Sequence, residues 1–227
     1  MKPRLGLGKA LWKKLCGVFP AGRDRALYRA VDRGLVWVGW APEVMDGAGK
    51  ILHISDTPTC MYGYLARLLR RINPSVIVHT GDLADDIKLE IYPGDAERYR
   101  IAARRLVNIL EAPRRKVILA LGNHDKRDLL PSLSSQCIIC DNVMDITLFG
   151  EEFRISHYIG FILDKPARYN LFGHSPEPAS FTDEKDRLFL NGIEKMRLID
   201  PEARMIFLNY PSGTDNARLT RRKRMAR

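Results

Sequence analysis

The sequence predicts an α/β fold in which strands alternate with helices in the first half and a second sheet packs on the first. Apolar strand-like runs alternate with helical patterns over residues 50–121, and the connections between them are short. Residues 138–208 contain short strand-like runs with few helices between them. A chain of 227 residues is long enough for one packed domain and an extension.

The first 48 residues differ from the rest in charge and pattern. Residues 7–19 place four apolar side chains on one helical face: Leu7, Leu11, Leu15 and Val18. A second helical spacing follows at residues 25–33, and the glycines of residues 46–49 predict a linker. We expect residues 1–48 to form a basic, partly helical extension, whose first helix either packs on the domain or makes peripheral contact with a membrane surface.

From residue 50 onward, short apolar runs predict strands at 51–55, 76–79 and 116–121, with helices at 64–71 and 98–110 between them. Further strands are predicted at 138–139, 143–148, 153–156, 169–172, 188–190 and 205–208. The scarcity of helices among these later runs predicts that they build the second sheet.

The net charge of +10 belongs to the two ends of the chain. Residues 1–35 hold nine Lys or Arg against two Asp, and residues 218–227 hold six Lys or Arg without an acid, which leaves −3 for the body. We expect residues 212–227 to form a basic C-terminal tail. Such a tail is either solvated or contacts nucleic acid or anionic lipid.

A cytoplasmic location is the expectation from composition. No apolar run approaches the roughly 20 residues that span a bilayer, and the N-terminal segment lacks the layout of a signal peptide. Four cysteines in a chain of this size do not indicate a disulfide framework. The pair Cys137 and Cys140 forms a single CxxC without a second pair, which favours structural cysteines over a zinc or redox site.

Metal-competent side chains follow the predicted strands. Asp56, Asp82 and the pair Asn123-His124 come directly after the first three. His157 and His174 follow two strands of the second half. Because parallel sheets gather their sites beyond the carboxyl ends of the strands, we expect these loops to converge.

This ordered set resembles the calcineurin-like metallophosphoesterase superfamily, whose pattern is D-x-H, G-D-x-x-D, G-N-H-D/E, a single His and G-H. The sequence carries G-D-L-A-D at 81–85 and G-N-H-D at 122–125, and the resemblance covers about residues 51–176. It implies a metallophosphoesterase domain over residues 49–211. The implied fold is a four-layer αββα sandwich, with two mixed β-sheets flanked by helices and a two-metal site between the loops.

The resemblance also implies roles. Asp82 matches the carboxylate that bridges two metals, and Asn123, His157 and His174 match the other ligands of one metal. This mixed oxygen and nitrogen set suits Mn²⁺ first, with Fe, Zn²⁺ or Ni²⁺ as alternatives. His124 matches a residue beside the metals that contacts phosphoryl oxygens or protonates the leaving group. Asp85 matches its hydrogen-bonding acid, or caps a helical turn.

Two positions depart from the family pattern. Pro58 stands where D-x-H has its histidine, and Pro176 stands where many members have a second one. Asp56 and Asp82 therefore leave the first of two expected metals with a weakened site. His53, Thr59 or Cys60 would have to replace the missing ligand, and the strand alternation points His53 to the opposite face.

The function that follows is hydrolysis of a phosphomonoester or phosphodiester by a hydroxide generated on the metals. Pro58 motivates one alternative, a degenerate phosphoesterase fold that serves as a binding or scaffold module. The basic ends motivate another, an enzyme associated with nucleic acid.

Overall fold

The structure is a computed structural model that describes residues 46–112, 115–134, 136–200 and 205–219. The helices expected over residues 7–19 and 25–33, and nearly all of the expected N-terminal extension, lie outside these ranges. Within the described ranges, no helix is long and apolar enough to cross a membrane.

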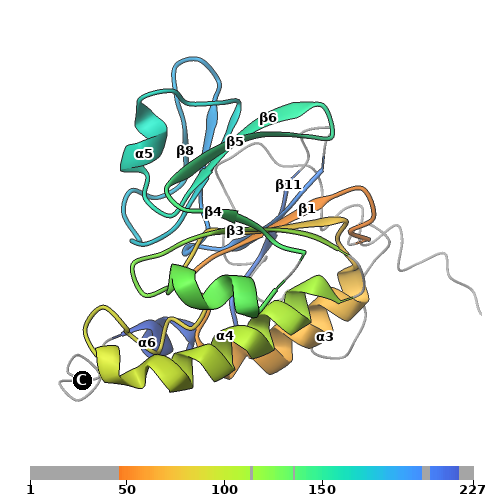
Figure 1. Cartoon of the computed structure of the whole chain (residues 1–227). Coiled ribbons are helices and arrows are strands. Elements are labelled where there is room, and N and C mark those ends of the chain that lie inside the picture. Colours follow the sequence, from red (N-terminus) through yellow and green to blue (C-terminus); the bar gives the residue numbers. More distant parts are fainter. Residues whose placement is uncertain (1–45, 113–114, 135, 201–204, 220–227) are drawn as a thin grey trace, which may run out of the picture. The chain divides into compact units, whose positions relative to one another are not determined.

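The first half of the domain is the predicted alternation of strands and helices (Figure 1). Its strands are β1 (Ile51–Ile54), β2 (Val76–His79) and β3 (Lys116–Ala120), and its helices are α3 (Tyr62–Ile72) and α4 (Ala96–Glu111). The three strands are parallel. Short 3-10 turns occupy η2 (Thr59–Met61), η3 (Pro93–Asp95) and η4 (Arg127–Ser132). Helix α3 ends where Asn73 takes a left-handed φ of 43°, just before Pro74.

The second half is mostly strands, as the pattern predicts. They are β4 (Ile138–Cys140), β5 (Val143–Leu148), β6 (Glu151–Ser156), β7 (Tyr169–Phe172), β8 (Phe181–Thr182), β9 (Leu188–Asn191), β10 (Met196–Ile199) and β11 (Met205–Leu208). Two short helices accompany them, α5 (Gly160–Leu163) and α6 (Thr214–Arg218).

These strands do not all enter the second sheet, which corrects the expectation. The six-stranded sheet has the order β11-β10-β1-β2-β3-β4, and the five-stranded sheet has the order β5-β6-β7-β9-β8. Strand β4 pairs in parallel with β3, and β10 pairs antiparallel with β1. Periodicity identifies a strand without naming its partner, so the sequence placed β4 and β11 in the wrong sheet.

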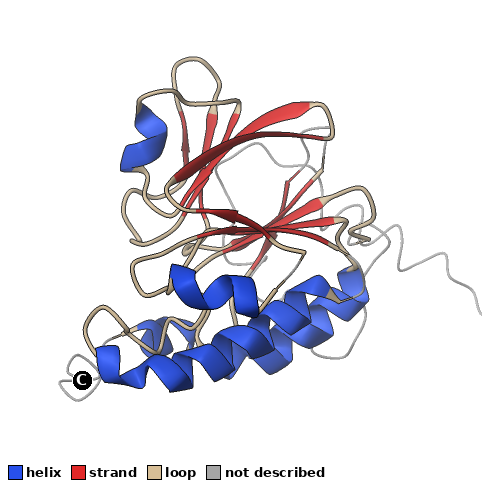
Figure 2. Ribbon diagram, in the orientation of Figure 1, coloured by secondary structure: helices blue, strands red, loops and turns tan. Residues whose placement is uncertain are grey.

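The two mixed sheets pack face to face (Figure 2). Ile51, Val78 and Ile118 of the first sheet share a buried cluster with Phe153 and Leu171 of the second. Helices α3 and α4 cover the outer face of the first sheet. The outer layer of the second sheet is thin, because there the one-turn helix α5 packs through Ile162. The predicted sandwich of two mixed sheets with flanking helices is confirmed.

The expected C-terminal tail begins as part of the fold. Helix α6 lies within residues 212–227, and Arg218 at its end is almost fully buried, with 8% of its side chain exposed. The Arg218 guanidinium donates to the backbone carbonyls of Asp56, Ser55 and Ile193. The guanidinium also stacks over the Tyr210 ring, with its central carbon 4.2 Å from the ring centroid. Arg218, which the sequence analysis assigned to the basic tail, is therefore a fixed part of the domain.

Candidate metal centre

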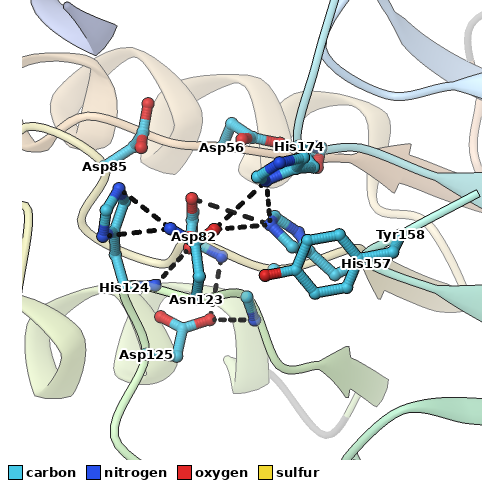
Figure 3. A network of polar contacts seen from close by, with 12 residues as sticks. Asp56, Asp82, Asp85, Asn123, His124, Asp125, His157, Tyr158 and His174 are labelled. Carbon is cyan, nitrogen blue, oxygen red and sulfur yellow. Dashed lines mark hydrogen bonds and ion pairs between the residues drawn. The ribbon is translucent and has the colours of Figure 1, made fainter. Parts of the chain in front are cut away.

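Parallel strands deliver the predicted ligands to one edge of the sandwich, where Figure 3 shows them converging. Asp56 and Asp82 have left-handed φ values of 50° and 57°, which Asp tolerates better than most residues. Two backbone hydrogen bonds tie their loops together, from Asp56 N–H to the Gly81 carbonyl and from Thr57 N–H to the Asp82 carbonyl, at 2.9 and 3.0 Å. The two turns therefore support each other.

Three donor atoms form a tight triangle at the centre of the site. Oδ1 of Asn123 lies 3.3 Å from Nε2 of His157 and 3.1 Å from Nδ1 of His174, and the two imidazole nitrogens are 3.2 Å apart. A cation about 2.1 Å from each of three ligands holds those ligands roughly 3.0–3.4 Å apart, depending on coordination number. The triangle therefore has the dimensions of one face of a metal coordination shell.

Hydrogen bonds behind the triangle orient the lone pairs of two of its three members, His157 and Asn123, toward the site. Nδ1–H of His157 donates to the Thr80 carbonyl at 2.7 Å, which leaves Nε2 unprotonated toward the site. Nδ2 of Asn123 donates to Glu90, so its carbonyl oxygen faces the two histidines. Two acceptors, Nε2 of His157 and Oδ1 of Asn123, then face each other at 3.3 Å. A cation relieves that repulsion, so the residues present fit a metal ion.

The two carboxylates border the triangle. Oδ2 of Asp82 lies 3.7 Å from Nε2 of His157, and its Oδ1 accepts the His124 backbone N–H at 3.0 Å. Oδ2 of Asp56 accepts the Ser55 hydroxyl and the His174 backbone N–H, the latter at 3.2 Å. Ligand atoms of Asp56, Asp82 and His157 all lie within 4.8 Å of one another. The structure thus brings together all five side chains predicted to bind metal.

Negative charge is concentrated here. Burial raises the pKa of Asp82 well above its usual value, and the nearby charges of Asp56 and Asp125 raise it further. Burial also raises the pKa of Asp85, with added repulsion from Asp56 and Asp82. Buried carboxylates that repel one another are stabilised by a bound cation, which removes the cost of ionising them.

His124 is buried beside the carboxylates, with 7% of its surface exposed. Burial and then the charge of Lys88 lower its pKa to about 4, so the ring is neutral near pH 7. Ligand atoms of Asp85, Asp82 and His124 lie within 4.8 Å of one another. The hydrogen bond that Asp85 accepts nevertheless comes from Lys88. Asp85 therefore forms an ion pair with Lys88 in place of the expected hydrogen bond with His124.

None of the three candidate replacements for the missing histidine reaches the site. Nε2 of His53 lies 3.0 Å from the Thr80 hydroxyl, away from the donor triangle. Thr59 donates its N–H and its hydroxyl to Asp86, at 2.7 and 2.8 Å. Cys60 is exposed and belongs to neither group of close ligand atoms found among the described residues. Pro58 therefore leaves the Asp56 side of the site without an added ligand from its own loop.

The sequence analysis assigned no role to four residues that complete the site. Three of them, Lys88, Glu90 and Asp125, contact the predicted residues through hydrogen bonds or ion pairs. Tyr158 packs its half-buried ring against His157 and His174, with ring centroids 4.8 and 4.6 Å apart. Asp125 was visible as the last residue of the G-N-H-D motif, and the only signal for Tyr158 was its position directly after a predicted functional histidine.

Asp125 fixes the loops from behind. Its Oδ2 accepts the backbone N–H groups of Asp82 and Gly122, at 2.8 and 2.9 Å. Its Oδ1 accepts the Leu83 N–H and the Tyr99 hydroxyl, both at 2.9 Å. A single carboxylate therefore ties the loop after β2 to the loop after β3 and sets the position of the Asp82 turn.

Comparison with known proteins identifies the family of the chain. The family model described as calcineurin-like phosphoesterase matches residues 49–214. The chain belongs to that family. No curated protein matches the chain. Among solved structures, the phosphoesterase YfcE of E. coli is 17% identical, with 70% of this chain and 100% of that chain covered and a TM-score of 0.47. A metallophosphoesterase from Sphaerobacter thermophilus is 16% identical, with 74% and 92% covered and a TM-score of 0.44.

Proposed function

We propose that this calcineurin-like phosphoesterase is a metal-dependent hydrolase of a phosphomonoester or phosphodiester. The observation that carries the proposal is the triangle of Asn123, His157 and His174, whose ligand atoms lie 3.1–3.3 Å from one another. Hydrogen bonds to Thr80 and Glu90 hold two of these donors in the orientation that a cation requires.

Asp82 would join the triangle as the fourth ligand, and Asp56 would approach from the other side. Mixed oxygen and nitrogen donors favour Mn²⁺, with Fe, Zn²⁺ or Ni²⁺ as alternatives. When bound, such an ion would supply an activated water and neutralise charge on phosphoryl oxygens. The protein's own contribution is to hold the ligand atoms in place and to keep His124 beside them.

His124 would act on the phosphate group. Its ring is neutral near pH 7, so one ring nitrogen carries a proton that can be donated to a phosphoryl oxygen. A phosphate dianion beside the ring would favour the protonated imidazole, which can then transfer its proton to the departing alkoxide. Replacing His124 by Asn should therefore lower kcat far more than it weakens metal binding.

The test is hydrolysis of bis-p-nitrophenyl phosphate and p-nitrophenyl phosphate with added Mn²⁺. The wild type should hydrolyse at least one, and Asp82→Asn should abolish the activity. Asp164→Asn is the matched control, because Asp164 is exposed at the end of α5 and should behave as the wild type. Activity that survives Asp82→Asn would refute the assignment.

Pro58 favours a second candidate, a phosphoesterase fold that binds metal and serves as a binding module. Without a ligand at that position, the site could retain one inert ion. One Mn²⁺ bound per chain together with no turnover of either substrate would favour this candidate over the enzyme.

A further inference from the structure

Lys88 brings a positive charge into the site from the turn that follows Asp85. Its neighbours Ile87 and Leu89 are buried, with 1% and 2% exposed, and they anchor the backbone on both sides. The Lys88 side chain is 11% exposed, and its ammonium forms an ion pair with Oδ1 of Asp85. An anchored, nearly buried lysine is unusual, because lysine normally keeps its charge in water.

The charge of Lys88 lies close to residues on both sides of the site. Its ammonium contacts Oδ1 of Asp85, and ligand atoms of Asp85, Asp82 and His124 all lie within 4.8 Å of one another. The ammonium is therefore held near the expected metal ligand Asp82 and near His124.

Few ligand atoms are available for a second divalent cation on the Asp56 side of the site. Pro58 has no side-chain donor, and Thr59 is engaged with Asp86. Oδ2 of Asp56 already accepts two hydrogen bonds, and Oδ1 of Asp85 is paired with Lys88. A divalent ion placed among these carboxylates would also meet the charge of the ammonium at close range.

We propose that the Lys88 ammonium, paired with Asp85, supplies the positive charge that a second divalent ion would otherwise bring, so that this chain binds one divalent ion at Asp82, Asn123, His157 and His174. The proposal rests on the proposed function, since it assumes that those four residues bind metal. An ammonium has three N–H donors. One is directed at Asp85, which leaves others for a phosphoryl oxygen of the substrate.

Isothermal titration with Mn²⁺ and electron paramagnetic resonance of the Mn²⁺-loaded full chain test the proposal without an activity assay. The wild type should bind one Mn²⁺ and give the six-line signal of an isolated ion. Lys88→Met removes the charge at similar length, and it should strengthen a second binding event at least tenfold and produce spin coupling between two ions. Lys88→Arg should keep the wild-type pattern.

Lys116→Met is the matched control, because Lys116 is exposed at the start of β3, at the far end of the strand from the site. It should leave stoichiometry and spectrum unchanged. Two coupled Mn²⁺ ions in the wild type would overturn the role of Lys88, and so would a second-site affinity that Lys88→Met leaves unchanged. No Mn²⁺ binding by the wild type would instead overturn the proposed function. If Lys88→Met does not fold, the stoichiometry and spectrum of the wild type still test whether the chain binds one Mn²⁺ or two.

Discussion

Gly122 lies against Asp82 so closely that its α-carbon has no room for a side chain. A β-carbon there would overlap Oδ1 of Asp82 and lie 2.6 Å from the Asp82 backbone nitrogen. The close approach lets the Gly122 N–H and the Asp82 N–H share one carboxylate oxygen of Asp125. Glycine is needed at this position for space, and not only because the chain turns there.

Replacing Gly122 by Ala should push the Asp82 carboxylate away from the donor triangle. We expect at least a tenfold loss of Mn²⁺ affinity, in the range that misplaced ligand supports cost in metal sites. The measurement is isothermal titration. Gly160→Ala is the control, because a β-carbon on Gly160 meets open space and should leave the affinity unchanged. Equal affinities for the two variants would mean that the Asp82 loop adapts freely.

Replacing Arg218 by Met should destabilise the domain. The change removes hydrogen bonds to three backbone carbonyls, of which those of Asp56 and Ser55 lie beside the site. The Ser55 carbonyl keeps the Tyr210 hydroxyl as a donor, whereas the carbonyls of Asp56 and Ile193 lose the Arg218 guanidinium. Buried acceptors left without partners cost about 1–3 kcal/mol each, so we expect a loss of roughly 2–4 kcal/mol in the free energy of unfolding in urea. Deletions that test the basic tail for nucleic-acid binding must therefore begin after Leu219.

Arg127→Met is the control for Arg218→Met. Arg127 also pairs with an acid, Asp141, but both side chains are more than half exposed. An exposed ion pair contributes under about 1 kcal/mol. If both variants unfold at the same urea concentration, Arg218 does not anchor the loop that carries Asp56.

The parts of the fold that the sequence predicts are those with a single dominant pattern. Strands β1, β2 and β3 are apolar runs followed within three residues by a metal-competent side chain, and parallel strands bring such loops together. Helix α3 follows from the spacing of Leu65, Leu68 and Ile72, all of which are buried. The site was therefore predictable to the extent that its ligands follow strands.

What the sequence did not predict depends on tertiary contacts. Strand β10 carries Arg197, which is 1% exposed and donates to the Asn191 and Lys195 carbonyls, so the run did not read as an apolar strand. Lys88 points inward only because its neighbours are buried, while an isolated lysine ordinarily indicates a solvated surface. The partner of a strand and the direction of a charged side chain are set by packing, which local periodicity does not report.

The CxxC pair should be slow to react with thiol reagents. Burial raises the pKa of Cys137 to about 12 and that of Cys140 to about 11. At pH 8 roughly one thiol in a thousand or fewer is then the reactive thiolate. In a Cys16→Ser background, reaction with dithionitrobenzoate should show one fast thiol, and Cys60→Ser should remove it, because Cys60 is exposed. A second fast thiol in native protein would contradict a structural role for the pair.

His79 should make the domain sensitive to acid, because it links the loops after β1 and β2 as a neutral ring. Its Nδ1 accepts the Gly81 N–H at 3.1 Å, and its Nε2–H donates to the Thr57 hydroxyl at 3.0 Å, which in turn donates to the Leu83 carbonyl. Burial is the main reason that the His79 pKa falls to about 3.

An unfolded chain protonates this ring below about pH 6.5, whereas the folded chain resists protonation until about pH 3. The unfolded state therefore binds more protons between these values, and the free energy of unfolding should fall as the pH drops from 6.5 toward 3, by up to about 1.4 kcal/mol per pH unit. His79→Asn keeps an acceptor near Gly81 but cannot titrate, so its urea-unfolding free energy should depend less steeply on pH. If the free energy of unfolding depends equally on pH in the wild type and the variant, protonation of His79 does not cause the loss of stability in acid.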